Sequence, residues 1–409
     1  IYLKYALQLV DAGWAYYAFD TAEELDALRR EAEERGEAFA YNYAVREKLA
    51  TSLALPADEV KARIERGDQW VIRFRMPENE TVAMDDLIRG HVEVNTSTLD
   101  DKVLYKSADA LPTYHLANIV DDRLMEVSHV IRGEEWLPSL PLHYLLYKAF
   151  GWTDVQPRFA HLPLLLKPTG GGKLSKRDGD KMGFPVFPLF WKSPTTGETA
   201  HGYREDGYFP EAFINMLALL GWNPGTEQEI FSMDELIKYF SLDGLSKSPA
   251  VFDYDKLGWI NGEYFKNMTD ADFASQSHAY AGDLPECLEK NWEMLAALLK
   301  TRVQYFSEVP AEIAFLVDLP AFDADLYNNK RNKVTPEKSA EIMPQLIGLL
   351  EPIAETEWNN DVLYAKLEAF VEESGLKKGL VMWVLRIGVA GQKVTPGGAT
   401  ELLSILGKE

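Results

Sequence analysis

The stretch Lys173-Leu174-Ser175-Lys176-Arg177 places three cations and a hydroxyl in five residues, directly after Gly170-Gly171-Gly172. Lysine and arginine side chains can stabilise the charge that moves between phosphate groups as a triphosphate reacts. Glycines let the backbone flex and approach a ligand closely. We therefore expect a phosphate-binding loop here. A solvated basic turn is the alternative, because so short a motif often occurs by chance.

Two further motifs precede this loop and indicate a family. Residues 111–122 read Leu-Pro-Thr-Tyr-His-Leu-Ala-Asn-Ile-Val-Asp-Asp, and residues 129–136 read His-Val-Ile-Arg-Gly-Glu-Glu-Trp. In this order, the three motifs resemble bacterial glutamyl-tRNA synthetase, and the pentapeptide resembles that family's version of the class I "KMSKS" signature. Linked motifs are far rarer by chance than any one of them. The resemblance, which continues to the C-terminus, implies a ligase that activates L-glutamate with ATP and transfers it to tRNA(Glu).

The resemblance also implies the domain organisation, a multidomain α/β plus all-α protein with a Rossmann-type catalytic domain. Five parts are expected: the end of the first Rossmann half (1–20), an α+β acceptor-binding insertion (21–103), the second Rossmann half (104–172), the basic loop with a stem-contact domain (173–266) and a helical anticodon-binding domain (267–409). The family's H-x-G-H motif, which opens a helix that holds the ATP phosphates, is not found in this sequence. We therefore expect that N-terminal segment to be missing, since Tyr2–Val10 already reads as the tail of an amphipathic helix.

Composition is that of an ordinary globular protein, with 46% apolar and 26% charged residues. The single cysteine, Cys287, excludes an intramolecular disulfide and a multi-thiolate zinc site, so we expect no zinc. No apolar run approaches membrane-spanning length and no leader is visible, so a cytoplasmic protein is expected.

Charge by itself argues against nucleic-acid binding, because the net charge is −22. Two local stretches reverse the sign: residues 330–333, and residues 375–393, which hold four cations and no acid. Both could be solvated helix ends. The resemblance suggests instead that the helical C-terminal part reads the anticodon, with Arg386 as the expected tRNA-binding residue.

Arg132 is the candidate that selects the substrate. It follows Val130-Ile131 in a mostly apolar run, where an unpaired guanidinium is costly to bury, so it needs an anion. Its counterpart in the resembling family binds the side-chain carboxylate of glutamate, which suits the planar fork of arginine. The alternative is an ion pair with Glu134 or Glu135.

Other site residues follow from the resemblance. Tyr114 and Asn118 lie four residues apart on one expected helical face and are assigned to glutamate. Each is also a candidate structural polar group. The residues assigned to ATP are Glu135, Trp136, Leu165, Leu166, Lys173, Ser175, Lys176 and Arg177. Asp121-Asp122 resembles a metal-binding pair but is interpreted as structural.

Local patterns predict individual elements. Thr21 and Glu24 form a capping box for a helix, and Leu142–Phe150 predicts a core helix that ends at Gly151. We expect 103–106 to be a strand that returns the chain to the catalytic domain. Residues 183–191 predict an aromatic hairpin packed on the core. Residues 210–220 predict a helix with its inward face formed by Phe213, Met216, Leu217 and Leu220.

The implied chemistry has two steps and needs no protein nucleophile. The glutamate α-carboxylate attacks the ATP α-phosphate, and a ribose hydroxyl of the tRNA then attacks the acyl adenylate. Lys173 and Lys176 would stabilise the departing pyrophosphate, with Mg2+ accompanying ATP. The alternatives are a catalytically incomplete tRNA-binding protein and a shortened enzyme that modifies a tRNA base, which the long helical C-terminus disfavours. A monomer is expected.

Overall fold

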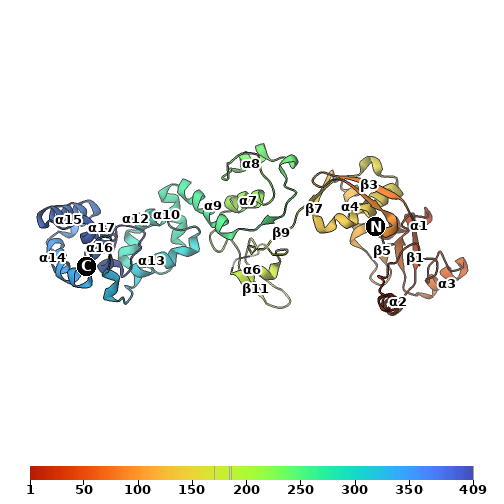
Figure 1. Ribbon diagram of the computed structural model, residues 1–409, viewed down its shortest axis with the longest axis horizontal. Helices are drawn as coiled ribbons and strands as arrows, with labels where there is room; N and C mark the ends of the chain where they lie inside the picture. Colours follow the sequence, from red (N-terminus) through yellow and green to blue (C-terminus); the bar gives the residue numbers. More distant parts are fainter. Residues whose placement is uncertain (170, 184, 186, 409) are drawn as a thin grey trace. The chain divides into compact units, whose positions relative to one another are not determined.

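The computed structural model describes residues 1–169, 171–183, 185 and 187–408. Its chain forms two compact units, labelled by element in Figure 1. The first unit comprises residues 1–166, 221–226 and 240–250, and the second comprises the remainder. Within the described ranges, no helix is long and apolar enough to cross a membrane.

One sheet of the first unit is antiparallel and has the order β1-β2-β5-β6. Its strands are β1 (Ala15–Ala18), β2 (Val71–Phe74), β5 (Val103–Lys106) and β6 (Leu111–Pro112), and the neighbouring helices are α1 (Tyr2–Asp11), α2 (Ala22–Glu34) and α3 (Ala57–Arg66). The predicted capping box at the start of α2 is confirmed. The predicted strand at 103–106 is confirmed as β5, and it pairs with β2 and β6 rather than with a parallel strand. A strand pattern predicts extended backbone, whereas its partner is chosen by contacts distant in sequence.

The other sheet of this unit has the order β4-β3-β8-β7. Its strands are β3 (Thr81–Asp86), β4 (Gly90–Asn95), β7 (His129–Gly133) and β8 (Arg158–Leu162), and the short strand β9 (Leu165–Leu166) follows. β3, β8 and β7 run parallel, while β4 forms an antiparallel hairpin with β3. Two helices, α4 (Tyr114–Leu124) and α5 (Leu140–Phe150), share a hydrophobic core with this sheet. α5 ends at Gly151 with φ of 72°, as predicted.

The second unit begins with the basic loop and short elements. These are α6 (Lys176–Met182), β10 (Trp191–Lys192), β11 (Thr199–Ala200), α7 (Pro210–Leu219), α8 (Met233–Tyr239), β12 (Ala250–Val251) and α9 (Tyr254–Asn267). β10 and β11 form the hairpin, but Leu189, Phe190 and Trp191 are about half exposed. The prediction that this segment packs on the core is therefore wrong for these side chains; Phe184 and Val186 lie outside the described residues. Leu217, predicted to face inward, is also 46% exposed.

The C-terminal part is helical, and no described residue between 252 and 408 belongs to a strand (Figure 1). Its helices are α10 (Asp270–His278), α11 (Glu286–Lys290), α12 (Trp292–Leu299), α13 (Val309–Val317), α14 (Pro336–Leu350), α15 (Asn360–Ser374), α16 (Lys378–Ala390) and α17 (Ala399–Leu406). They bury two apolar clusters, one around Phe265 and Leu295 and one around Leu346 and Leu363. The predicted change from mixed α/β to all-α structure is confirmed.

Candidate active site

Three polar side chains lie at the carboxyl ends of the parallel strands. Arg132 of β7 is directly opposite His161 of β8, and Asp86, the last residue of β3, is opposite Phe159. Ligands of open parallel sheets bind in the crevice beyond these strand ends. This edge of the sheet is therefore the candidate binding site.

Arg132 is half-buried and donates three hydrogen bonds. Its Nε donates to His161 Nε2 (3.0 Å), its Nη1 to the Tyr114 hydroxyl (3.1 Å) and its Nη2 to His143 Nδ1 (3.3 Å). The guanidinium also lies 5.7 Å from the centre of the Phe159 ring. The structure thus brings Arg132 and Tyr114 together, as the sequence prediction requires.

The hydrogen-bond partners of this arginine are all uncharged side chains, although its charge opposes the rise in the Asp122 pKa that burial causes. Glu134 instead pairs with Arg89 at 2.6 Å. The alternative explanation of Arg132 as half of an ion pair is therefore wrong for Glu134. A half-buried guanidinium whose direct partners are uncharged attracts an anionic ligand.

Asn118 lies one turn along α4 from Tyr114. Its Nδ2 donates to Asp122 Oδ2 (2.9 Å), while its Oδ1 is buried and has no hydrogen-bond partner. The neighbouring Asp121 accepts a hydrogen bond from the Tyr2 hydroxyl (2.9 Å). Asn118 therefore keeps an acceptor for a donor group of a ligand, whereas Asp121 connects α4 to α1.

Two histidines beside Arg132 are held uncharged at neutral pH. Burial, together with Arg132 and His115, lowers the pKa of His143 well below its ordinary value. Burial, followed by Lys102 and Arg132, lowers the pKa of His115 to about 4. Sequence reasoning missed His115, His143 and His161. The available signal was that these three of the seven histidines lie in apolar runs.

One of the residues assigned to the nucleotide lies next to the side chains around Arg132. Trp136 stands beside Tyr114, with ring centres 4.3 Å apart. Gly133 packs tightly on Glu135, since a Cβ atom at Gly133 would come within 2.1 Å of Glu135 Oε2. Leu165 and Leu166 form the half-buried strand β9.

The basic loop belongs to the second unit. Ser175 is the N-cap of α6, and its hydroxyl donates to Asp178 Oδ2 (2.6 Å), which is also 2.9 Å from the Ser175 backbone nitrogen. Lys167 pairs with Asp178 at 3.0 Å. The hydrogen bond from Ser175 and then that from Lys167 hold the Asp178 pKa at about 2. Lys173 is exposed; Gly170 and the side chains of Lys176 and Arg177 lie outside the described residues.

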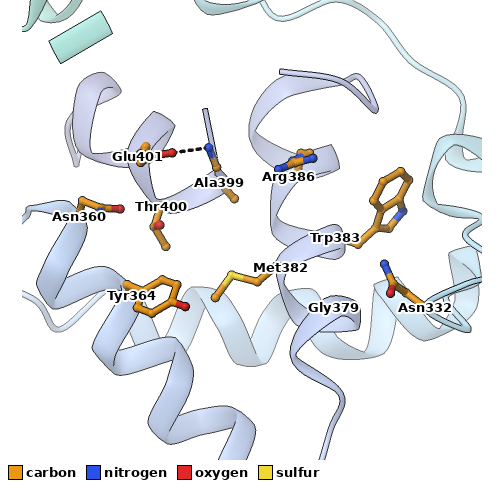
Figure 2. A pocket seen from close by; sticks show the side chains of 11 residues that line it. Asn332, Asn360, Tyr364, Gly379, Met382, Trp383, Arg386, Ala399, Thr400 and Glu401 are labelled. Atoms are coloured by element: carbon orange, nitrogen blue, oxygen red, sulfur yellow. Dashed lines mark hydrogen bonds between the residues drawn. The ribbon is translucent and has the colours of Figure 1, made fainter. Parts of the chain in front are cut away.

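A pocket of about 490 Å³ in the helical part contains the predicted tRNA-binding residue (Figure 2). Arg386 and Trp383 come from α16, and Tyr364 and Asn360 from α15. The Oδ1 of Asn360 is buried without a partner. A cation, aromatic rings and an unpaired amide oxygen are suited to binding unpaired bases.

Comparison with known proteins agrees with this arrangement. Residues 1–259 match the family "tRNA synthetases class I (E and Q), catalytic domain", and residues 264–409 match "Anticodon binding domain". These two family matches, over residues 1–259 and 264–409, define a class I tRNA synthetase.

More specific relatives cover the whole chain. It is 48% identical to the glutamate–tRNA ligases of Phocaeicola vulgatus and of Flavobacterium johnsoniae, and spans 79% of the length of each. A crystal structure of a glutamate tRNA ligase from Elizabethkingia meningosepticum, in complex with its amino acid, superposes with a TM-score of 0.87 at 43% identity, covering 99% of this chain and 79% of the other. The chain belongs to the glutamate–tRNA ligase family.

Proposed function

We propose that the protein joins L-glutamate to the 3′ end of tRNA(Glu) through a glutamyl-adenylate formed from ATP. The observation that carries this proposal is Arg132, whose three hydrogen-bond partners are all uncharged. A free amino acid with an anionic side chain fits it. Glutamine would leave the guanidinium charge unpaired, a mismatch that binding sites reject strongly.

The residues at the carboxyl ends of the strands bind different parts of the two substrates. Arg132 takes the glutamate side-chain carboxylate, and the Tyr114 hydroxyl and the unpaired Asn118 Oδ1 contact the rest of the amino acid. Trp136, Glu135, Leu165 and Leu166 border the nucleotide. The reaction then requires the α-carboxylate to meet the α-phosphate, so its rate depends on positioning.

The basic loop stabilises the departing pyrophosphate through Lys173 and Lys176, with Ser175 and Arg177 also contacting the phosphates. Mg2+ arrives with ATP as part of the substrate, which suits an ion that keeps phosphate oxygens and waters as ligands. Among the described residues, no group of three or more histidine, cysteine or acidic side chains could hold a metal ion. The absence of zinc stays a prediction.

The tRNA is bound at several places along the chain. The pocket around Arg386 takes an anticodon base, and the parts expected at 21–103 and 173–266 contact the acceptor end and the stem. These domain boundaries stay predictions. The protein works as a monomer in the cytoplasm.

Arg132→Gln in the full gene product tests the central assignment. Loss of a charge-assisted pair predicts an increase of about 100-fold in the KM for glutamate during tRNA charging. Arg158→Gln removes an exposed arginine from the adjacent strand β8 and serves as the matched control, with the KM of the parent protein. An unchanged KM in Arg132→Gln would refute the assignment.

A second experiment separates the enzyme from a tRNA-binding protein without activity. Lys176→Ala should lower adenylate formation by about a hundredfold or more while the thermal unfolding temperature stays unchanged. If the parent protein binds tRNA but charges none of it, the alternative of a catalytically incomplete protein replaces this proposal.

A further inference from the structure

A buried carboxylate lies behind the substrate-binding arginine, one side chain away. Asp86 is 4% exposed, and its Oδ2 accepts a hydrogen bond from His161 Nδ1 at 2.6 Å. Its Oδ1 also accepts from the backbone nitrogens of Ile88 (2.9 Å) and Arg89 (2.8 Å). Burial by itself raises the Asp86 pKa, but the hydrogen bonds from His161 and from the backbone outweigh it and hold the pKa at about 2. Asp86 is therefore ionised throughout the physiological range.

The hydrogen bonds determine which nitrogens of the two fully buried histidines carry hydrogen. Arg132 can only donate, so His161 Nε2 and His143 Nδ1 must both be acceptors. The His161 hydrogen consequently sits on Nδ1 and is directed at Asp86. The His143 hydrogen sits on Nε2 and is directed at His115 Nδ1, 3.2 Å away. Asp86 thus selects the one tautomer of His161 that can accept from Arg132.

This arrangement fixes the guanidinium without neutralising it. Its Nε is held by His161, and its two terminal nitrogens each use one N–H on Tyr114 or His143. Each terminal nitrogen carries a second N–H, which has no acceptor among the described residues. Had Asp86 contacted Arg132 directly, its charge would have cancelled the attraction for an incoming anion.

We propose that Asp86 and His161 are positioning residues that fix the tautomer and orientation needed for Arg132 to present two free N–H groups to the carboxylate of glutamate. The inference rests on the role of Arg132 under Proposed function. The pair thereby sets the preference for glutamate over glutamine. Neither residue touches the substrate, and both act through Arg132.

The test uses tRNA charging by the full gene product, with KM measured separately for glutamate, glutamine and ATP. His161→Leu removes both hydrogen bonds, and the loss of a hydrogen bond to a charged group predicts a glutamate KM increased about 10- to 100-fold. The KM for ATP should change less than about twofold, and the preference for glutamate over glutamine should fall in proportion. His161→Gln keeps a carbonyl for Arg132 and an amide N–H for Asp86, so it should recover most of the loss.

The exposed pair of His91 with Asp85 provides a matched control, because His91 Nδ1 lies 2.8 Å from Asp85 Oδ1 on the neighbouring hairpin. His91→Gln should leave every KM unchanged. If His161→Leu does not fold, Asp86→Asn decides: a raised glutamate KM supports the proposal and an unchanged one overturns it.

Two results overturn the inference in distinguishable ways. If Arg132→Gln raises the glutamate KM but His161→Leu does not, or if His161→Leu raises the KM for ATP equally, the positioning role fails while the proposed function stands. If Arg132→Gln itself leaves the glutamate KM unchanged, the proposed function fails first.

Discussion

Acid should lower the free energy of unfolding of the first unit, because the histidines beside Arg132 are uncharged when folded. The size of this effect can be worked out for His115. Its pKa falls from the ordinary 6.5 to about 4 in the folded protein, mainly because of burial. Between pH 6.5 and pH 4, His115 is therefore protonated in the unfolded chain but not in the folded chain. The contribution of the uncharged His115 to the free energy of unfolding is complete above pH 6.5 and is lost as pH falls through 4. At about pH 5 the cost is about 1 to 2 kcal/mol, after allowance for the partial exposure of His115.

His115→Gln removes this titration and leaves a carbonyl that can accept from His143 Nε2. The free energy of unfolding should then fall by about 1 to 2 kcal/mol less between about pH 7.5 and pH 5 than in the parent protein. Urea unfolding should be monitored by mass spectrometry of peptides from α4 and α5. This measures the free energy of unfolding of the first unit separately from that of the helical part.

His91 offers a control of opposite sign. Hydrogen bonds with Asp85 and then Glu93 raise the pKa of this exposed histidine, so its stabilisation is complete below pH 6.5 and is lost as pH rises through the folded pKa. His91→Gln should therefore make the acid destabilisation slightly larger. Equal pH dependence of His115→Gln and the parent protein would show that burial of His115 does not govern its protonation.

The remaining predictions concern the anticodon pocket, the nucleotide side, the metal and the helical core. Arg386→Gln should raise the KM for tRNA and reduce by about one the slope of the logarithm of tRNA affinity against the logarithm of salt concentration. Lys366→Gln, on the exposed face of α15, should change both quantities less. Gly133→Ala must displace the Glu135 carboxylate and should raise the KM for ATP severalfold more than the KM for glutamate; equal changes would contradict it. Chelation of Mg2+ should abolish charging but leave glutamate protection of the first unit against proteolysis intact. Phe265→Ala should lower the free energy of unfolding of the helical part by about 3 to 5 kcal/mol, measured by urea denaturation.

The resemblance of local motifs assigns Arg132 and Tyr114 to one site, and the structure joins their side chains at 3.1 Å. Helix ends are also predicted where one or two residues decide them, as at Gly151 and at Thr21, which caps α2. The exposed hairpin residues around Trp191 were mispredicted, because aromatic content indicates burial only on average.

The contacts of Asp86 and His161 that position Arg132 could not be predicted from local motifs. Asp86 and His161 are separated by 75 residues, and they meet only because β3 and β8 are parallel neighbours. The pairing of β5 with β2 likewise depended on which edges the sheets left available.

The sequence by itself determined the family, the change from α/β to helical structure and the cluster of cations in the basic loop, since these depend on residue types at short spacing. Only the tertiary structure decided that Arg132 has uncharged partners and that a buried aspartate orients it through a histidine. Strand order determines which distant side chains share one edge of a sheet, and that order is set by long-range packing, which short-range patterns do not encode.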